Sequence, residues 1–462
     1  MARYIKSIGI DFGSSNTVVS AIVEGEMRPV VFKNPKTASE CFESVMSVAD
    51  GERKYFQSAM TDVSGKRYDT LKEKILDCNG AENAEHYLRA LFSAITDSEQ
   101  FKRRGYDLSR LNEVVFGYPA YYEPHAVKAY CDILTGIISG IFGKRQLKIN
   151  CYPEPMLAAT AYSFANGSDS AYKHVLADGS RMLILDFGGH TLDLSVARTV
   201  RNGNSVTLVT ECDSGSISQF VRMGKSLTKD ICASAYDTDH PKFDFELEQA
   251  KCKLFKDGEG YREASVEGLL KYKADSGATR FKMIYGKTSG KAFENGCVRI
   301  GLCNPDIGIE RQYESFVSCI CGYLSNNKVE EHSLNCVLFT GGASKIVPMR
   351  EAVISGISQY LVRGAAVKTV DECGSTVAEY YDGGSVILSS SNAVALGAAL
   401  ACGRTSEKSK TEKSGRRAKQ VSTEDYRFLG EQLAEIYNYL NNNVDKNSPV
   451  YENIFKILNR KR

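Results

Sequence analysis

The chain has 462 residues, of which 43% are hydrophobic and 25% are charged, and its formal net charge is +2. This composition is typical of a globular protein with a large core, and the near-neutral charge excludes a basic surface spread over the whole chain, so no specific nucleic-acid partner is expected. The 14 cysteines include no Cys-x-x-Cys pair, which excludes the usual zinc and iron–sulfur motifs.

The sequence also carries no recognisable targeting feature. Its first residues enter an expected strand directly, without the apolar region of a signal peptide. No uninterrupted apolar stretch reaches the roughly 18 residues typical of a membrane helix. We therefore expect a cytoplasmic protein with reduced thiols and no membrane partner.

The first part of the chain alternates between strand and helix patterns. A polar, irregular stretch at 36–110 contains a helix at 84–95, where apolar residues recur at helical spacing. The other expected elements are strands at 7–11, 17–23, 112–119 and 147–155 and helices at 123–143 and 156–164.

The pattern begins again at Arg181. The stretch "LILDFGGHTLDLS" (183–195) repeats "IGIDFGSSNTVVS" (8–20): an apolar strand, Asp-Phe-Gly, small polar residues and a second strand. The later expected elements are helices around 217–236 and 243–256, a strand at 337–344, and helices at 346–357 and 391–403.

The composition changes after this closing helix. Residues 404–420 contain seven Lys or Arg against two Glu, a local charge of about +5, and almost no apolar residue. We expect a flexible basic linker at 403–420. Apolar residues then recur at helical spacing, which predicts a helical hairpin at 421–462.

The two copies share a pattern suited to phosphate chemistry. Each places an aspartate, Asp11 or Asp186, at a strand end before a glycine-containing turn. The backbone N–H groups of such a turn bind phosphate, and a carboxylate beside phosphate needs a hydrated Mg²⁺ between them. Two facing copies would hold a polyphosphate–magnesium unit from both sides. The alternative that both copies are only tight β-hairpins stays open at this point.

Several motifs together resemble the actin-like ATPase superfamily, and most closely the nucleotide-binding domain of the seventy-kilodalton heat-shock chaperones. The matches follow the family's order over residues 5–402. They are "IGIDFGSSNT", "VVFGYPAYYEPHAVKAY", "CYPEPMLAATAY", "LILDFGGHTLDLSVA", "FELEQAKCKLF", "VLFTGGASKIVPMREAV" and "SNAVALGAAL".

This resemblance implies an α/β fold of two lobes, built from duplicated ribonuclease-H-like domains with a nucleotide cleft between them. Lobe I would span 1–180, with an insertion subdomain at about 36–110. Lobe II would span 181–402, with an insertion subdomain at about 216–300.

The resemblance also assigns catalytic roles. Asp11 and Asp186 would hold the magnesium ion through water, Glu154 would be the base that orients the attacking water, and Asp193 would assist it. The family's phosphate-binding lysine would be Lys72, with Lys74 as the alternative.

The ligand-binding residues follow in the same way. The phosphates would be bound by Gly13, Ser14, Ser15, Asn16, Gly188, Gly189, His190 and Thr191, and the nucleoside by Glu248, Lys251, Gly341, Gly342, Ala343 and Lys345. Two of these depart from the family. Lys345 replaces an arginine that stacks on adenine, and lysine lacks the planar group for stacking. His190 replaces a glycine.

We therefore expect a protein that binds Mg-ATP, hydrolyses it to ADP and closes its lobes as it does so. The 60 residues after position 402 are too few for the family's peptide-binding domain. A protein partner would instead engage the C-terminal tail or lobe II. An actin-like filament-forming ATPase and a nucleotide sensor without turnover remain alternatives, and the oligomeric state stays open.

Overall fold

The computed structural model describes most of residues 2–402. The gaps are 63, 78, 121, 144–145, 168–174, 190, 204, 213–214, 218–247, 249–261, 268–279, 286–292, 295–296 and 301–308. Met1–Gly403 forms one compact unit and Arg404–Arg462 is divided off as a second. The expected linker at 403–420 and hairpin at 421–462 lie outside the described residues, as do the helices expected at 217–236 and 243–256, apart from Ile217 and Glu248.

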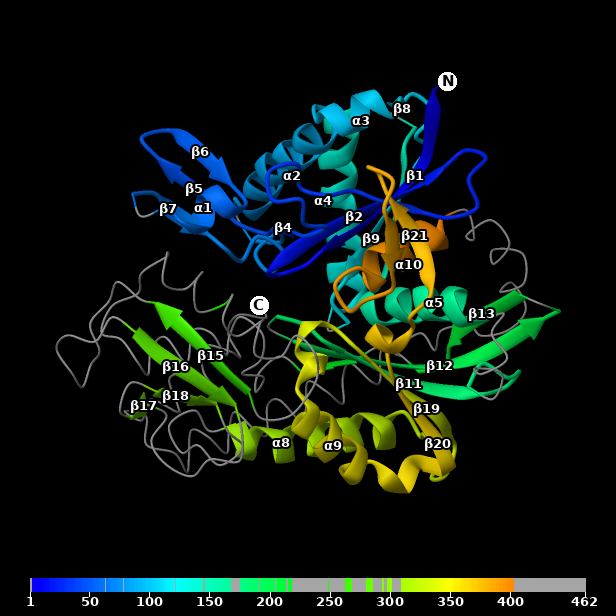
Figure 1. Cartoon of the computed structure of the whole chain (residues 1–462). Helices are drawn as coiled ribbons and strands as arrows, with labels where there is room; N and C mark the ends of the chain where they lie inside the picture. Colours follow the sequence, from blue (N-terminus) through cyan, green and yellow to red (C-terminus); the bar gives the residue numbers. More distant parts are fainter. Residues whose placement is uncertain are drawn as a thin grey trace, which may run out of the picture. The chain divides into compact units, whose positions relative to one another are not determined.

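The first sheet has the strand order β10-β9-β1-β2-β3-β21-β22, with β4 and β8 attached at its sides (Figure 1). Its strands are β1 (Arg3–Phe12), β2 (Asn16–Val23), β3 (Val30–Val31), β4 (Phe42–Glu43), β8 (Tyr106–Asp107), β9 (Glu113–Tyr118), β10 (Lys148–Pro153), β21 (Thr376–Tyr380) and β22 (Ser385–Ile387).

The second sheet has the order β13-β12-β11-β19-β20, with β14 paired to β12. Its strands are β11 (Arg181–Phe187), β12 (Leu192–Asn202), β13 (Ser205–Thr210), β14 (Gly215–Ile217), β19 (Leu334–Thr340) and β20 (Leu361–Thr369).

The two sheets repeat one topology over five strands. In the first, β1, β2 and β3 are antiparallel neighbours, and β9 and β10 continue parallel to β1 on its other side. In the second, β11, β12 and β13 are antiparallel, and β19 and β20 continue parallel to β11. The repeat seen in the sequence is therefore a repeat of strand order and direction. The mixed α/β class expected from the sequence is confirmed.

Two helices lie between the sheets. Helix α10 (Ala393–Ala401) contacts β1, β2 and β9 of the first sheet, and α5 (Glu154–Asn166) contacts β11, β12 and β13 of the second (Figure 1). The two helices also pack against each other. One apolar cluster, which includes Val115, Leu157, Ile184 and Leu396, runs through both helices and both sheets.

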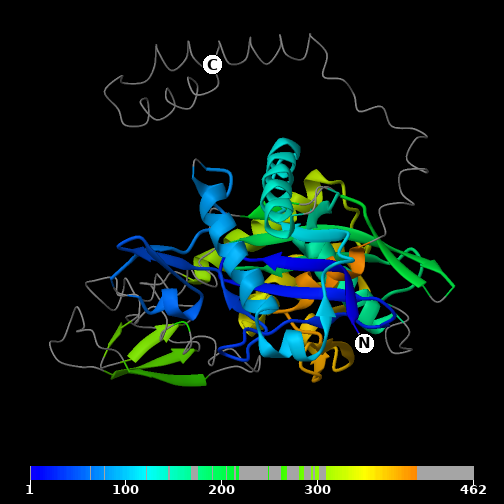
Figure 2. The same cartoon turned by 90° about the horizontal axis from the view of Figure 1, so that it is seen from above.

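The outer faces of the sheets carry further helices. Helices α2 (Gly80–Thr96) and α4 (Pro124–Phe142) cover the first sheet, as Figure 2 shows from above, and their apolar faces bury Ile8, Ile10 and Phe12 of β1. Helices α8 (Ile309–Asn326) and α9 (Val347–Gly356) lie beside the second sheet (Figure 1). No helix in the described ranges combines the length and the apolar character that crossing a membrane requires.

The remaining elements are short. Between β4 and β8 lie a three-stranded sheet and two small helices, namely β5 (Met46–Ala49), β6 (Glu52–Tyr55), β7 (Lys66–Tyr68), α1 (Gln57–Met60) and α3 (Glu99–Arg103). A four-stranded sheet follows β14, namely β15 (Arg262–Glu267), β16 (Arg280–Tyr285), β17 (Phe293–Glu294) and β18 (Cys297–Ile300). Short 3₁₀ turns are η2 (Gly342–Lys345), η3 (Ser358–Tyr360) and η4 (Val370–Glu372).

The contact between α10 and α5 requires a residue without a side chain. A Cβ atom added at Gly397 of α10 would overlap the backbone carbonyl of Leu157 in α5. Both atoms belong to backbones that the surrounding core holds in place, so neither can move without cost. Gly397 thus sets how closely the two helices, and with them the two sheets, approach each other.

We expect the substitution Gly397→Ala to lower the free energy of unfolding by about 1–3 kcal/mol, because the added methyl group overpacks this contact. Gly136→Ala on α4 is the matched control, since a Cβ there meets nothing within 4 Å and alanine is about 0.5–1 kcal/mol more favourable than glycine inside a helix. Urea denaturation followed by circular dichroism measures both. Equal stability of the two variants would contradict this account of the contact.

Candidate functional site

The two Asp-Phe-Gly turns have the same backbone geometry. In the first, the Gly13 N–H donates to the Asn16 carbonyl at 3.0 Å, and in the second the Gly188 N–H donates to the Thr191 carbonyl at 2.9 Å. The strand residues before and after each turn are also in matching register, with Asp11 opposite Val18 and Asp186 opposite Asp193. Each turn thus holds its aspartate at the end of a central strand.

The two turns meet. A Cβ atom added at Gly189 would lie 2.7 Å from Ser15 Oγ and 3.7 Å from Ser14 Cβ. The second turn therefore packs directly against the first, and a larger residue at Gly189 would push them apart. Ser14, Ser15 and Gly189, all expected to bind phosphate, are brought together.

Five charged side chains gather where these strands end. The Lys72 ammonium donates a hydrogen bond to Glu154 Oε1 and forms an ion pair with it. Asp11, Asp186 and Asp193 lie close enough to this pair to interact with it electrostatically. The exposed fractions are 4% for Lys72, 8% for Glu154, 7% for Asp186 and 2% for Asp193.

The structure distinguishes between the two candidate lysines. Lys72 is buried in this cluster, whereas Lys74, two residues further along, is exposed. Both follow β7 and precede α2. The resemblance placed Lys72 first and left Lys74 as the alternative, and Lys72 comes from a segment 82 residues away from Glu154 in the chain.

The aspartates at the two strand ends hold their protons more tightly than usual. Burial and the nearby charge of Glu154 raise the pKa of Asp11 to about 7, although Lys72 acts in the opposite direction. Burial raises the pKa of Asp186 well above its usual value, and the charges of Glu154, Asp193 and Asp11 add to the effect. Both carboxyl groups lie in a site with more negative charge than the one lysine can balance.

The same negative charges keep Lys72 protonated. Burial alone would lower the pKa of its ammonium group, but the charges of Glu154 and Asp11 and the hydrogen bond to Glu154 raise it above the ordinary value. Lys72 is therefore a permanent cation at neutral pH. It is the only ammonium among the five clustered side chains.

The excess of carboxylates suits a hydrated divalent cation. Among the described residues, no group of three or more His, Cys, Asp or Glu side chains is placed to coordinate a metal ion directly. Mg²⁺ commonly keeps several waters and uses few protein carboxylates. Asp11 and Asp186 lie at the ends of β1 and β11, and a nearby cation would favour their ionised form, so they fit the role of accepting hydrogen bonds from such waters.

Asp193 is held next to the second turn. It lies opposite Asp186 in the β11–β12 register and is buried. The Thr191 hydroxyl donates to Asp193 Oδ2 at 3.3 Å. Asp193, the expected assistant to Glu154, therefore connects that turn to the other members of the charged cluster.

Glu154 lies at the junction of a strand and a helix. Pro153 ends β10, and Glu154 is the first residue of α5. The N-terminus of a helix stabilises a carboxylate, because its backbone N–H groups carry partial positive charge. The same end of α5 thus holds the carboxylate that pairs with Lys72.

The glycine pair after β19 lies against the second aspartate. Gly341 has a positive φ of 81°, and a Cβ atom there would overlap the Phe187 carbonyl and lie 2.5 Å from Asp186 Oδ1. Glycine is therefore required for both reasons. Gly342 and Ala343 follow in η2, so the candidate nucleoside-binding turn adjoins Asp186.

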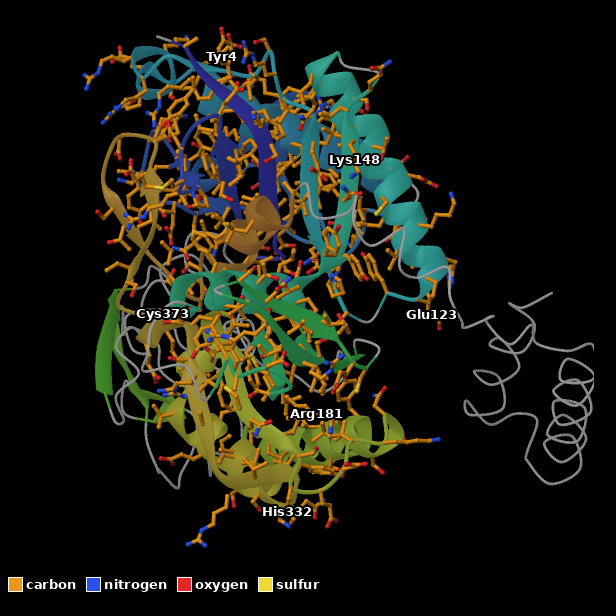
Figure 3. The ribbon with its side chains drawn as sticks, turned by 90° about the vertical axis from the view of Figure 1, so that its right-hand side faces the viewer. Tyr4, Glu123, Lys148, Arg181, His332 and Cys373 are labelled. Carbon is orange, nitrogen blue, oxygen red and sulfur yellow. The ribbon has the colours of Figure 1, made fainter. Side chains whose placement is uncertain are left out.

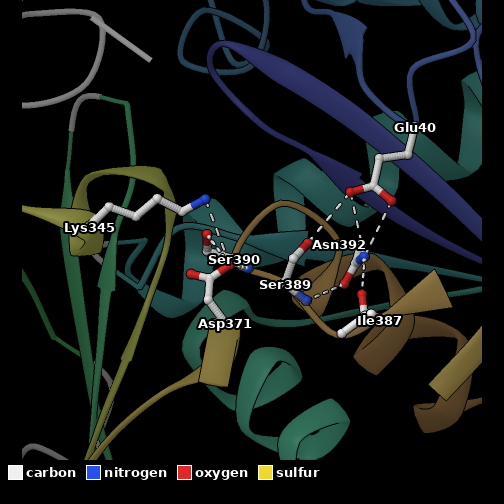
Figure 4. A network of polar contacts seen from close by, with 7 residues as sticks. All are labelled: Glu40, Lys345, Asp371, Ile387, Ser389, Ser390 and Asn392. Atoms are coloured by element: carbon white, nitrogen blue, oxygen red, sulfur yellow. Dashed lines mark hydrogen bonds and ion pairs between the residues drawn. The ribbon is translucent and has the colours of Figure 1, made fainter. Parts of the chain in front are cut away.

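Lys345, at the end of η2, forms an ion pair with Asp371 at 3.7 Å (Figure 4). Asp371 Oδ1 also accepts hydrogen bonds from the Ser390 backbone N–H at 3.0 Å and from the Ser390 hydroxyl at 3.3 Å. A carboxylate therefore anchors Lys345. The sequence contained no signal for Asp371, because it lies 26 residues away in a segment without a recognised motif.

A second carboxylate contacts the adjoining residues of the same loop (Figure 4). Glu40 accepts hydrogen bonds from Asn392 Nδ2 at 3.2 and 3.4 Å and from the Ser389 hydroxyl at 3.5 Å. Asn392 precedes α10 and accepts from the Ser389 N–H at 2.9 Å. Glu40 falls in the stretch expected to be polar and irregular, and the sequence analysis did not identify it.

Three predicted residues fall in or beside the gaps in the described chain. His190 and Lys251 lie outside the described residues. Glu248 is described as a half-buried helical residue, and the chain on both sides of it lies in the gaps. No protein-family model matches the sequence.

We expect the substitution Asp11→Asn to stabilise the protein increasingly as the pH rises from 5 to 8, measured without nucleotide or magnesium. The folded state holds the Asp11 proton up to about pH 7, whereas the unfolded chain releases it near pH 4. Stability from this group is therefore lost as the pH rises through that window. The difference between variant and wild type should grow by roughly 2 kcal/mol across it.

Urea denaturation at each pH measures this difference. Asp50→Asn is the matched control, because Asp50 lies on an exposed turn with a positive φ that asparagine also tolerates. A difference that stays constant from pH 5 to pH 8 for Asp11→Asn would show that the Asp11 carboxyl is already ionised in the folded protein at pH 5.

Proposed function

We propose that the protein binds Mg-ATP between its two sheets and hydrolyses it to ADP and phosphate, as a two-lobed ATPase with duplicated ribonuclease-H-like lobes of the actin and heat-shock-chaperone type. The observation that carries the proposal is the meeting of two equivalent Asp-Phe-Gly turns beside the buried Lys72–Glu154 pair. The duplicated strand order supports the same fold.

The backbone N–H groups of the two turns bind the β- and γ-phosphates. The turns supply Gly13, Ser14, Ser15, Asn16, Gly188, Gly189, His190 and Thr191. Such nests of N–H groups bind anions without cationic side chains. Asp11 and Asp186 would hold a magnesium ion through its water molecules, and the ion would neutralise phosphate charge.

Lys72 binds the γ-phosphate, and Glu154 is the general base for the attacking water. In the structure, the Lys72 ammonium and the Glu154 carboxylate are paired with each other. A γ-phosphate offers Lys72 a stronger anion, so Lys72 turns to it and Glu154 is released. Glu154 then accepts a proton from a water whose oxygen attacks the γ-phosphorus, while the bond from that phosphorus to the β-phosphate oxygen breaks. Asp193 orients this water together with Glu154.

This exchange makes the base available only when a γ-phosphate is present. ADP leaves Lys72 paired with Glu154, so the two nucleotide states differ in the contacts across the cluster. Because α5 begins at Glu154 and lies between the sheets, the difference is transmitted to the packing of the two halves. We propose that ATP binding closes the two halves of the protein on the nucleotide. This closure would act on a protein partner, through the residues after 402 or through the second half of the chain.

In this proposal the nucleoside is held by Lys345, by the turn at Gly341–Gly342, and by Glu248 and Lys251. The Asp371 carboxylate keeps the Lys345 ammonium in place. Lysine contributes a point charge rather than a stacking plane, so the base is held less by stacking than in the chaperones that the sequence resembles.

We expect Glu154→Gln to lower kcat for ATP hydrolysis by about 10²–10⁴-fold, because general-base catalysis typically contributes that much, while ATP still binds. Lys72→Ala should lower kcat by about 10²–10³-fold through loss of charge stabilisation at the phosphate. Release of inorganic phosphate measures turnover, and titration calorimetry measures ATP binding.

Lys74→Ala is the matched control, since Lys74 is an exposed lysine two residues away, and it should hydrolyse ATP like the wild type. If the wild type binds ATP tightly but releases no phosphate, the protein is a nucleotide sensor and not an ATPase. ATP-dependent growth of light scattering in the same samples would indicate a filament-forming ATPase. A wild type that binds no ATP would overturn the proposal.

A further inference from the structure

Gly117 is a glycine inside a buried strand. It belongs to β9 and lies opposite Tyr152 in the parallel pairing of β9 with β10. Its φ is not positive, so the backbone conformation does not require glycine here. Glycine weakens a strand, and inside one it often marks a point where another group approaches the backbone closely.

The group that approaches Gly117 is the Glu154 side chain. A Cβ atom added at Gly117 would lie 2.7 Å from Glu154 Cγ and 3.1 Å from Glu154 Oε1. Its other near neighbour would be Val394 Cγ1 of α10, at 3.1 Å. Glu154 Oε1 is the oxygen that accepts the hydrogen bond from Lys72. The Glu154 side chain therefore occupies the space that a side chain at position 117 would fill.

The backbone of Gly117 is itself held in place. The hydroxyl of Tyr130, a fully buried residue of α4, donates to the Gly117 carbonyl at 3.2 Å. Helix α4 packs beside β10, as Figure 3 shows near the labelled residues Glu123 at the start of α4 and Lys148 at the start of β10. Gly117 is thus fixed from the outer side of the sheet while Glu154 contacts it.

We infer that Gly117 is a positioning residue for Glu154, because the missing side chain at this position lets the Glu154 carboxylate lie against β9 and reach Lys72. The inference rests on the proposed function for the role of Glu154 as the general base. The placement of the carboxylate follows from the packing alone. The Glu154 backbone is fixed at the start of α5, whereas its side chain is flexible, so a side chain at position 117 would displace the carboxylate and leave the fold intact.

The first test is the substitution Gly117→Ala. We expect kcat for ATP hydrolysis to fall about 10²-fold, because a misplacement of about 1 Å can cost a catalytic group that much, whereas the affinity for ATP should not fall. Stability in urea should match the wild type or rise, because alanine is more favourable than glycine in a strand. Gly136→Ala on α4, where a Cβ atom meets nothing within 4 Å, is the matched control and should keep the wild-type kcat.

The second test does not depend on turnover. Urea denaturation of Lys72→Met, Glu154→Gln and the double variant measures the coupling free energy of the ion pair. The same cycle is then repeated with Gly117→Ala present in all four proteins, where we expect the coupling to be lost.

Unchanged coupling of the ion pair, or a wild-type kcat for Gly117→Ala, would overturn the inference. If the coupling is lost but the wild type releases no phosphate from ATP, Gly117 still positions Glu154 and the proposed hydrolysis is what fails. The two failures are therefore distinguishable.

Tyr130→Phe is a second variant that adds no atoms to the contact. It removes the hydrogen bond to the Gly117 carbonyl and keeps the ring, whose centroid lies 5.5 Å from that of Tyr122. We expect a smaller fall in kcat than for Gly117→Ala, and no further fall when Glu154→Gln is also present. A fall that persists in the Glu154→Gln background would show that Tyr130 acts by another route than the position of Glu154.

Discussion

The packing of α10 against α5 is the constraint on which the rest of the site depends. Helix α10 lies on the first sheet and α5 on the second, so the distance between the helices sets the distance between the sheets. The absence of a side chain at Gly397 allows backbone contact at Leu157. At this separation the ends of β1 and β11 meet, and Gly189 of one turn touches Ser15 of the other. A wider separation would divide the cluster into two unrelated halves.

The charged cluster that results lowers the stability of the folded protein. Four carboxylates lie around one buried lysine, and burying charges costs free energy that the Lys72–Glu154 pair offsets only in part. Raised pKa values that arise from burial and from neighbouring charges are typical of functional sites. A hydrated magnesium ion bound beside these carboxyl groups would offset their mutual repulsion, and a phosphate group would give the Lys72 ammonium a further anionic partner.

Strands β21 and β22 connect the two sheets at a place away from this cluster. After β20 of the second sheet, the chain crosses to the first sheet, where β21 pairs in parallel with β3. Strands β21 and β22 fall within the range expected for lobe II, yet they extend the first sheet. The loop that follows is held by Glu40 and Asp371 (Figure 4), and it leads directly into α10. Asp371, which anchors Lys345, thus also holds the loop that leads into the central helix.

The sequence by itself determined the repeated Asp-Phe-Gly turns and the strands around them, because a turn of this kind depends on neighbouring residues and on glycine at set positions. It therefore identified Asp11 and Asp186 and the mixed α/β class. Only the tertiary structure decided that Lys72, and not Lys74, meets Glu154, and that Glu40 and Asp371 anchor the loop before α10. These contacts join segments that are distant in the chain, and burial, which sets their pKa values and partners, arises only when the sheets and helices have packed.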